Sequence, residues 1–129
     1  MPPDMFRLIM ERQRELQHDS FGINPIGLVG AERDHYVQAM ALALNVEIGE
    51  ALQEISWKPW ATGCWFNREA YLVELIDALH FWFNLALVAT ADPEELFDVY
   101  MRKADINAAR QRDGYTGEKC PTCGRGSEG

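Results

Sequence analysis

Apolar residues recur at helical spacing in four segments of this 129-residue chain, and no segment alternates apolar and polar residues with a period of two. Without that alternation there is no candidate strand. The chain therefore predicts an all-α fold, a bundle of four main helices. The expected helices extend from Asp4 to about Gln17, and over about 32–55, 67–90 and 92–112.

The predicted helices begin at residues that are suited to capping. Asp4, Asn67 and Asp92 precede the first, third and fourth helices, and such side chains accept hydrogen bonds from free N–H groups. Pro93 follows Asp92 at the first helical position, which favours a helix start there. Segments rich in Gly, Pro and Asn, at 20–27 and 57–63, predict loops.

Length and composition indicate one domain over residues 1–117, followed by a Gly-rich tail at 118–129. The N-terminus lacks the basic and apolar regions of a signal peptide, and the longest apolar stretch, 78–89, is too short to span a bilayer. Three cysteines do not form a disulfide framework. We therefore expect a cytoplasmic protein.

The charge balance narrows the classes of partner. The chain has 20 acidic and 12 basic residues, a formal net charge of −8. Proteins that grip a nucleic-acid backbone neutralise phosphates with Lys and Arg, and anionic membranes attract basic segments. We expect no nucleic-acid polymer and no membrane as partner. Excess carboxylate suits solubility or divalent cations instead.

Two acidic pairs stand out. Glu47 and Glu50 are three residues apart on the predicted second helix, and Glu74 and Asp77 repeat that spacing on the third. Residues three apart share a helix face. A helix break between the pairs lets the two helices fold back antiparallel, so that the four carboxylates oppose one another.

The second pair belongs to a polar stripe, about 120° wide, on an otherwise apolar helix. Glu74, Asp77, His80 and Asn84 make up this stripe. Crowded carboxylates that lose hydration need a compensating cation. The compensating charge is either a hard divalent cation or a basic side chain in an ion pair. The candidates for such an ion pair are Lys58, Lys103 and Arg110.

These residues resemble a known signature. Glu47-x-x-Glu50, then 23 residues, then Glu74-x-x-Asp77 is similar to the motif of the all-α nucleoside triphosphate pyrophosphohydrolases, which include the MazG-like enzymes and the dimeric all-α dUTPases. The dUTPase branch is indicated by three stretches. They are Ser56-Trp57-Lys58-Pro59-Trp60, the segment 74–81, and Tyr100-x-x-Lys103-x-x-x-Asn107-x-x-Arg110-Gln111-x-x-Gly114-Tyr115.

The resemblance implies Mg²⁺-dependent hydrolysis of a deoxynucleoside triphosphate to the monophosphate and pyrophosphate. It makes Glu47, Glu50, Glu74 and Asp77 the ligands of two or more Mg²⁺ ions, with Mn²⁺ as a substitute. Glu47 or Glu50 also positions or deprotonates the attacking water. The implied phosphate contacts are Lys58, Lys103, Asn107, Arg110 and Tyr115.

For the base, the resemblance favours dUTP, and a purine nucleotide, as in phage MazG-like enzymes, is the alternative. The dUTPase branch reads uracil partly with a Gln and an Asn close together near the N-terminus. Here Gln17 and Asn24 are seven residues apart, which keeps the purine alternative open. The candidate base and sugar contacts are Gln17, Asn24, Trp57, Trp60, His80, Phe81 and Asn84.

Three further expectations concern assembly, the tail and other classes of protein. The apolar third helix is more than one small bundle covers, which predicts a homodimer or a higher oligomer. Cys120 and Cys123 form either half of a structural Zn²⁺ site or an incidental pair in a disordered tail. A di-iron bundle is disfavoured because only Asp77-x-x-His80 imitates its motif. A non-catalytic helical adaptor is the alternative outside enzymes.

Overall fold

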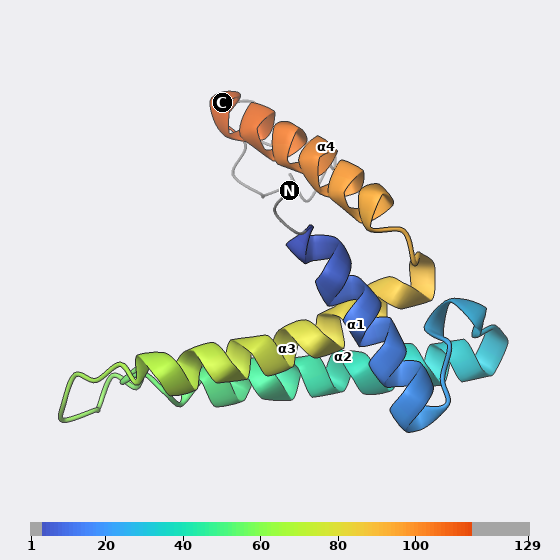
Figure 1. Cartoon of the computed structure of the whole chain (residues 1–129). Coiled ribbons are helices and arrows are strands. Elements are labelled where there is room, and N and C mark those ends of the chain that lie inside the picture. The colour runs from blue at the N-terminus through green and yellow to red at the C-terminus, as the bar shows by residue number, and fades with distance from the viewer. Residues whose placement is uncertain (1–3, 115–129) are drawn as a thin grey trace, which may run out of the picture. The chain divides into compact units, whose positions relative to one another are not determined.

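The computed structural model describes residues 4–114, which contain four α-helices, one 3₁₀ turn and no strand, so the predicted all-α class is confirmed. One isolated antiparallel bridge joins Ile55 and Phe66. Figure 1 shows the helices. The elements are α1 (Met5–Phe21), η1 (Pro25–Gly27), α2 (Gly30–Leu52), α3 (Arg68–Ala89) and α4 (Pro93–Arg112).

Two of the three predicted caps are confirmed. A carboxylate oxygen of Asp4 accepts from the Arg7 N–H at 3.0 Å, and one of Asp92 accepts from the Glu94 N–H at 2.9 Å. Asn67 stands at the start of α3 but makes no capping bond. Its Nδ2 instead donates to Glu54 Oε2 at 3.0 Å, because the chain fold brings that carboxylate within reach.

Two helix ends differ from prediction. α1 continues past Gln17 to Phe21 and stops at Gly22, whose φ of 66° is left-handed and whose N–H donates to carbonyls of the last turn. The 20–27 loop is therefore shorter than expected and contains η1. α2 ends at Leu52, before the expected position near Ile55.

α2 and α3 run antiparallel and side by side as a hairpin (Figure 1). Its loop, residues 53–67, closes at the base, where the Ser56 N–H donates to the Trp65 carbonyl at 3.1 Å. The Trp65 N–H donates in turn to Ser56 Oγ at 3.0 Å. This pairing fixes where α3 starts relative to the end of α2, and so sets which residues of the two helices face each other.

The core lies where α1 crosses the hairpin (Figure 1). Met10 of α1 and Leu87 of α3 are each 1% exposed, and Pro25 of η1 is buried beside them. The Phe6 and Phe83 rings approach to 5.7 Å between centroids. This junction anchors α1 at one end of the hairpin and leaves the loop end of α2 and α3 projecting beyond it.

The chain divides into two compact units, Met1–Ala91 and Asp92–Gly129, of which the first holds α1, η1, α2 and α3 and the second holds α4. The predicted domain boundary after residue 117 lies outside the described residues.

α3 is long and apolar enough to cross a membrane by length and composition, with 22% of its 18-residue window buried. Core helices of soluble proteins pass the same test.

Candidate metal centre

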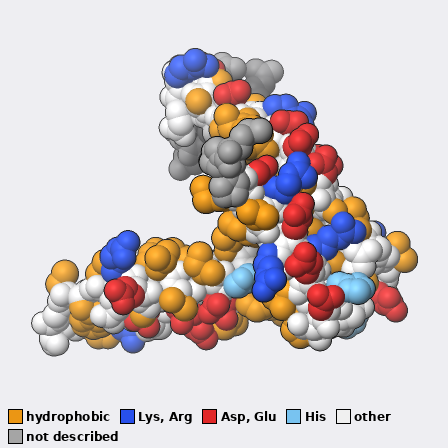
Figure 2. Space-filling view, in the orientation of Figure 1, with side chains coloured by type: hydrophobic (Ala, Val, Ile, Leu, Met, Phe, Trp, Pro, Cys, Tyr) orange, Lys and Arg blue, Asp and Glu red, His pale blue; other side chains and the backbone are white. Residues whose placement is uncertain are grey.

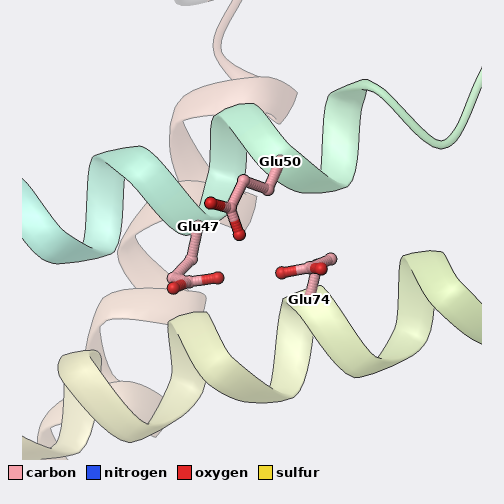
Figure 3. A group of neighbouring side chains, drawn as sticks. All are labelled: Glu47, Glu50 and Glu74. Atoms are coloured by element: carbon pink, nitrogen blue, oxygen red, sulfur yellow. The ribbon is translucent and has the colours of Figure 1, made fainter.

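Three carboxylates meet between α2 and α3. Glu47 and Glu50 project from α2 toward Glu74 of α3 (Figure 3), and one oxygen of each lies within 4.8 Å of the others. Glu47 and Glu74 are half-buried, whereas Glu50 is exposed. Asp77 follows one turn after Glu74, is half-buried, and acts on both half-buried glutamates through its charge. The predicted opposition of the two acidic pairs is thus present in the fold.

Two oxygens of this cluster lack partners. Oε2 of Glu47 and Oε2 of Glu74 are buried, and no hydrogen bond reaches either. A buried acceptor without a donor is costly. A proton or a cation placed between the two helices would remove that cost.

The crowding also changes proton affinity. The protonated carboxyl of Glu47 donates to the Glu74 carboxylate, and this raises the pKa of Glu47 to about 7. Burial, a similar donation to Glu50 and the charges of Glu50 and Asp77 act in the same direction. The hydrogen bond from Glu47 lowers the pKa of Glu74, but burial and the same two neighbours outweigh it and raise that pKa. All the side chains that shift these two pKa values are acidic, so the cluster favours the binding of a positive charge.

The ligand chemistry fits a hard divalent cation. Carboxylate oxygens suit Mg²⁺, Mn²⁺ or Ca²⁺, whereas Zn²⁺ and Cu²⁺ prefer sites that include imidazole or thiolate. Glu47, Glu50 and Glu74 offer oxygen only, and the nearby Asp77 adds a fourth carboxylate. The two unpartnered oxygens are the observation that favours a cation here over a solvated acidic surface.

The polar stripe of α3 continues from the carboxylates to α1. His80 is exposed, and Asn84, one turn further, is 2% exposed. The Nε2 of Gln13, itself 3% exposed, donates to Asn84 Oδ1 at 2.6 Å. Two adjoining cavities of about 370 and 400 Å³ are both lined by Arg12, Gln13 and His80. The stripe therefore connects the acidic cluster to a polar pocket between α1 and α3.

Sequence reasoning missed Gln13. The signal for it was its spacing, since Met10, Gln13 and Gln17 occupy the buried stripe of α1. Gln17 was a predicted base contact, and in the fold it is 5% exposed and accepts a hydrogen bond from the Tyr36 hydroxyl at 2.8 Å. Burial raises the pKa of Tyr36 to about 12.

The other base candidates are spread over the first unit. Phe81 is half-buried on α3, and Asn24 is exposed and lines a separate cavity of about 560 Å³ along α1. Trp57 and Trp60 lie in the 53–67 loop, where they line a third cavity of about 280 Å³ together with Lys58. The Lys58 ammonium lies 6.0 Å from the centroid of the Trp57 ring. These tryptophans and His80 thus line different cavities.

Three predicted phosphate contacts lie on α4. Lys103, Asn107 and Arg110 are all exposed and are spaced four and three residues apart, which puts them on one face of that helix. α4 belongs to the second compact unit. Tyr115, Cys120 and Cys123 lie outside the described residues.

The fold and the site define the class of this protein: an all-α chain with opposed acidic pairs on two antiparallel helices. A family model described as dUTPase matches residues 5–96, a span that includes the whole acidic cluster. The chain therefore belongs to this dUTPase family, and the sequence resemblance is confirmed at the family level. Membership indicates nucleoside triphosphate pyrophosphatase chemistry. No curated protein and no solved structure matches the chain.

Proposed function

We propose that this protein hydrolyses dUTP to dUMP and pyrophosphate with Mg²⁺ held by Glu47, Glu50, Glu74 and Asp77. The observation that carries the proposal is the meeting of three carboxylates within 4.8 Å, two of which have a buried oxygen without a partner. Like charges this close are unfavourable unless a cation joins them. The family match supports the nucleotide as the substrate.

When bound, Mg²⁺ neutralises the triphosphate and makes a coordinated water a better nucleophile. The reaction consumes one water, breaks the bond between the α-phosphoryl group and the next bridging oxygen, and releases pyrophosphate. Glu50 is the exposed carboxylate of the cluster, so water from the solvent side meets it first. We assign Glu50 to orient that water and accept its proton, with Glu47 as its partner on α2.

The remaining polar residues have positioning roles in this proposal. Lys58, Lys103, Asn107, Arg110 and Tyr115 supply cations and donors for the phosphates, as phosphoryl transfer requires. The pocket between α1 and α3 is the first candidate for the base, because the Gln13 amide and the His80 imidazole both line it and His80 is one turn from Asp77. Uracil presents two carbonyl acceptors and one N–H donor, and the amide of Gln13, which Asn84 holds in place through its hydrogen bond, has both a donor and an acceptor group to complement them. Gln17 then supports the pocket through Tyr36.

Trp57 and Trp60 are a second candidate surface for the base. Their indoles line the loop cavity, and Trp60 is 72% exposed. Base–aromatic stacking tolerates any base, so this surface suits a purine as well as uracil. Asn24 and Phe81 are the remaining candidate contacts. In either case the protein acts on a nucleotide pool, and we expect it in the cytoplasm.

The test is an end-point assay with Mg²⁺ on dUTP, dUDP, dTTP, dCTP, dATP, dGTP and GTP, in which monophosphate and pyrophosphate are resolved separately. The expected result is release of dUMP and pyrophosphate in preference to all other products. Preference for dGTP, GTP or dATP would keep the metal centre and assign the protein to purine nucleotides. Absence of turnover with both Mg²⁺ and Mn²⁺ would refute the proposal and favour a helical adaptor.

Glu50→Gln is the active-site variant for this assay, and Glu69→Gln is its matched control. Glu69 is an exposed glutamate in the first turn of α3, outside the acidic cluster. Loss of a carboxylate that binds the metal removes several kcal/mol of transition-state stabilisation, which is at least ~100-fold in rate. The control variant should retain its rate within about twofold, since a surface charge contributes little.

A further inference from the structure

Two amides and a thioether form a chain of hydrogen bonds that connects α2, α3 and α1. Asn84 of α3 donates from Nδ2 to the sulfur of Met40 on α2 at 3.4 Å. The same Asn84 accepts at Oδ1 from Gln13 Nε2 of α1 at 2.6 Å. α1 carries acidic and basic side chains on its outward face (Figure 2), whereas Gln13 is only 3% exposed. This buried polar chain lies outside the acidic cluster.

The sulfur of Met40 fixes the direction of every hydrogen bond in this chain. A thioether accepts hydrogen bonds and cannot donate them. The NH₂ group of Asn84 must therefore face Met40, which turns the oxygen of Asn84 toward Gln13. The Gln13 amide must in turn direct its own NH₂ group to Asn84. Rotation of either amide alone by 180° would bring two acceptors or two donors together.

This direction decides which group Gln13 offers to the cavities between α1 and α3. Its Nε2 is bound to Asn84, and no hydrogen bond engages its Oε1 in the described part of the chain. That oxygen is not among the buried unpartnered side-chain atoms of the described residues, so it is open to the two cavities that Gln13 lines. The free end of the amide is therefore an acceptor. Met40 is half-buried on α2 and reaches this site through Asn84.

We propose that Met40 is a positioning residue that sets the polarity of the base pocket, so that the pocket selects bases with a ring N–H group. The proposal rests on the proposed function, which places the base between α1 and α3. Uracil, thymine and guanine carry a ring N–H on the edge that proteins read by hydrogen bonds, and it can donate to Gln13 Oε1. Cytosine and adenine have a ring nitrogen acceptor in that place, which would face the amide oxygen. Among purines, the pocket then favours guanine over adenine.

Removal of the sulfur should release both amides together. Met40→Leu keeps the apolar volume but supplies no acceptor to Asn84. Asn84 can then rotate and donate to Gln13 Oε1, and Gln13 offers its NH₂ group to the pocket. That second arrangement satisfies the same two amides and suits cytosine and adenine. Met40→Leu should therefore shift the base preference rather than abolish binding.

Titration calorimetry with dUMP and dCMP, and with dGMP and dAMP, compares bases of matched size. The wild type should bind dUMP at least ~10-fold more tightly than dCMP, and dGMP more tightly than dAMP. Met40→Leu should reduce the preference for dUMP over dCMP by about 3- to 10-fold and should bind dCMP more tightly than the wild type does. Met10→Leu is the matched control, because Met10 is a buried methionine of α1 outside the chain of hydrogen bonds. It should keep the wild-type preference within about twofold.

A Met40 that only fills space would change the affinity for all four nucleotides alike. A dUMP-to-dCMP preference that Met40→Leu leaves unchanged would therefore overturn the inference, provided that far-UV circular dichroism shows the variant to be helical. Equal binding of dUMP and dCMP by the wild type, or no binding of any of the four, would also overturn it.

Binding of monophosphates is read without turnover, so the two proposals fail separately. Hydrolysis of dUTP combined with an unchanged preference in Met40→Leu would retain the proposed function and refute the role of Met40. The predicted preferences without hydrolysis of any triphosphate would support the role of Met40 and refute the proposed hydrolysis. In an active enzyme, Met40→Leu should raise the KM for dUTP and keep kcat within about twofold, because the acidic cluster is untouched.

Discussion

The buried amide pair that joins α1 to α3 gives the sharpest prediction about stability. Gln13 and Asn84 are 3% and 2% exposed, and the 2.6 Å hydrogen bond between them connects the two helices. Replacing Asn84 with Leu keeps the branched shape of the side chain but leaves the Gln13 amide buried without its acceptor. The cost of an unsatisfied buried group is about 1–3 kcal/mol.

That cost converts to a measurable shift in melting temperature. The unit Met1–Ala91 has an unfolding entropy of roughly 0.19 kcal/mol/K, at about 2.1 cal/mol/K per residue. A loss of about 2 kcal/mol then lowers Tm by roughly 10 °C. The double variant Gln13→Met/Asn84→Leu removes both polar partners and should recover most of this loss, because no amide is left unpaired.

Thermal melts of the wild type, both single variants and the double variant complete a double-mutant cycle. The expected result is a strong positive coupling, with the double variant more stable than either single one. A double variant that loses the sum of the two single losses would refute the reasoning, because the amides would then act independently. The double variant should still show a raised KM for the nucleotide, since Gln13 lines the pocket proposed for the base.

Three further outcomes follow from the same structure. Mg²⁺ at 100 times its Kd should stabilise the wild type by ~2.7 kcal/mol and Glu47→Gln by much less, as read by thermal melts with and without EDTA; an equal gain in both would contradict the assigned ligands. The pKa of Glu47 is raised from 4.5 to about 7, so its protonation contributes stability that is fully present below pH 4.5 and is lost as pH rises through about 7. The metal-free melting temperature of the wild type should therefore fall between pH 5 and pH 8, and that of Glu47→Gln should change much less. A wild-type melting temperature that rises over this range, with the rise lost in Glu47→Gln, would contradict the predicted direction. Leu87→Ala, at a side chain 1% exposed, should cost about 2–5 kcal/mol in urea unfolding, against less than ~0.5 kcal/mol for the exposed Leu42→Ala; equal losses would mean that the core lies elsewhere.

The sequence predicted the parts of this fold that depend on local patterns. Helical spacing identified all four helices, and the caps at Asp4 and Asp92 form as expected, because both need only a neighbouring N–H group. Asn67 fails as a cap because its partner, Glu54, lies across the hairpin loop, and no local pattern encodes that contact. The end of α1 was placed too early for a similar reason, since His18 and Asp19 are polar residues that also fit a loop.

The acidic cluster was predictable because its members have regular spacing on two helices joined by a single break. Gln13 was not, since a glutamine on an amphipathic helix usually faces solvent, and only the position of α1 against α3 buries it. The fold also separates residues that the sequence grouped together. Trp57 and His80 line different cavities, because the hairpin loop carries the tryptophans away from the junction with α1.

The most direct test of the central claim combines turnover and stability in one variant, Glu50→Gln. If Glu50 serves a metal centre, dUTP hydrolysis with Mg²⁺ should fall at least ~100-fold, and the metal-free melting temperature should stay the same or rise because a crowded like charge is removed. If the cluster is only structural, turnover should survive and the melting temperature should fall. Retained hydrolysis with lost stability would contradict the account.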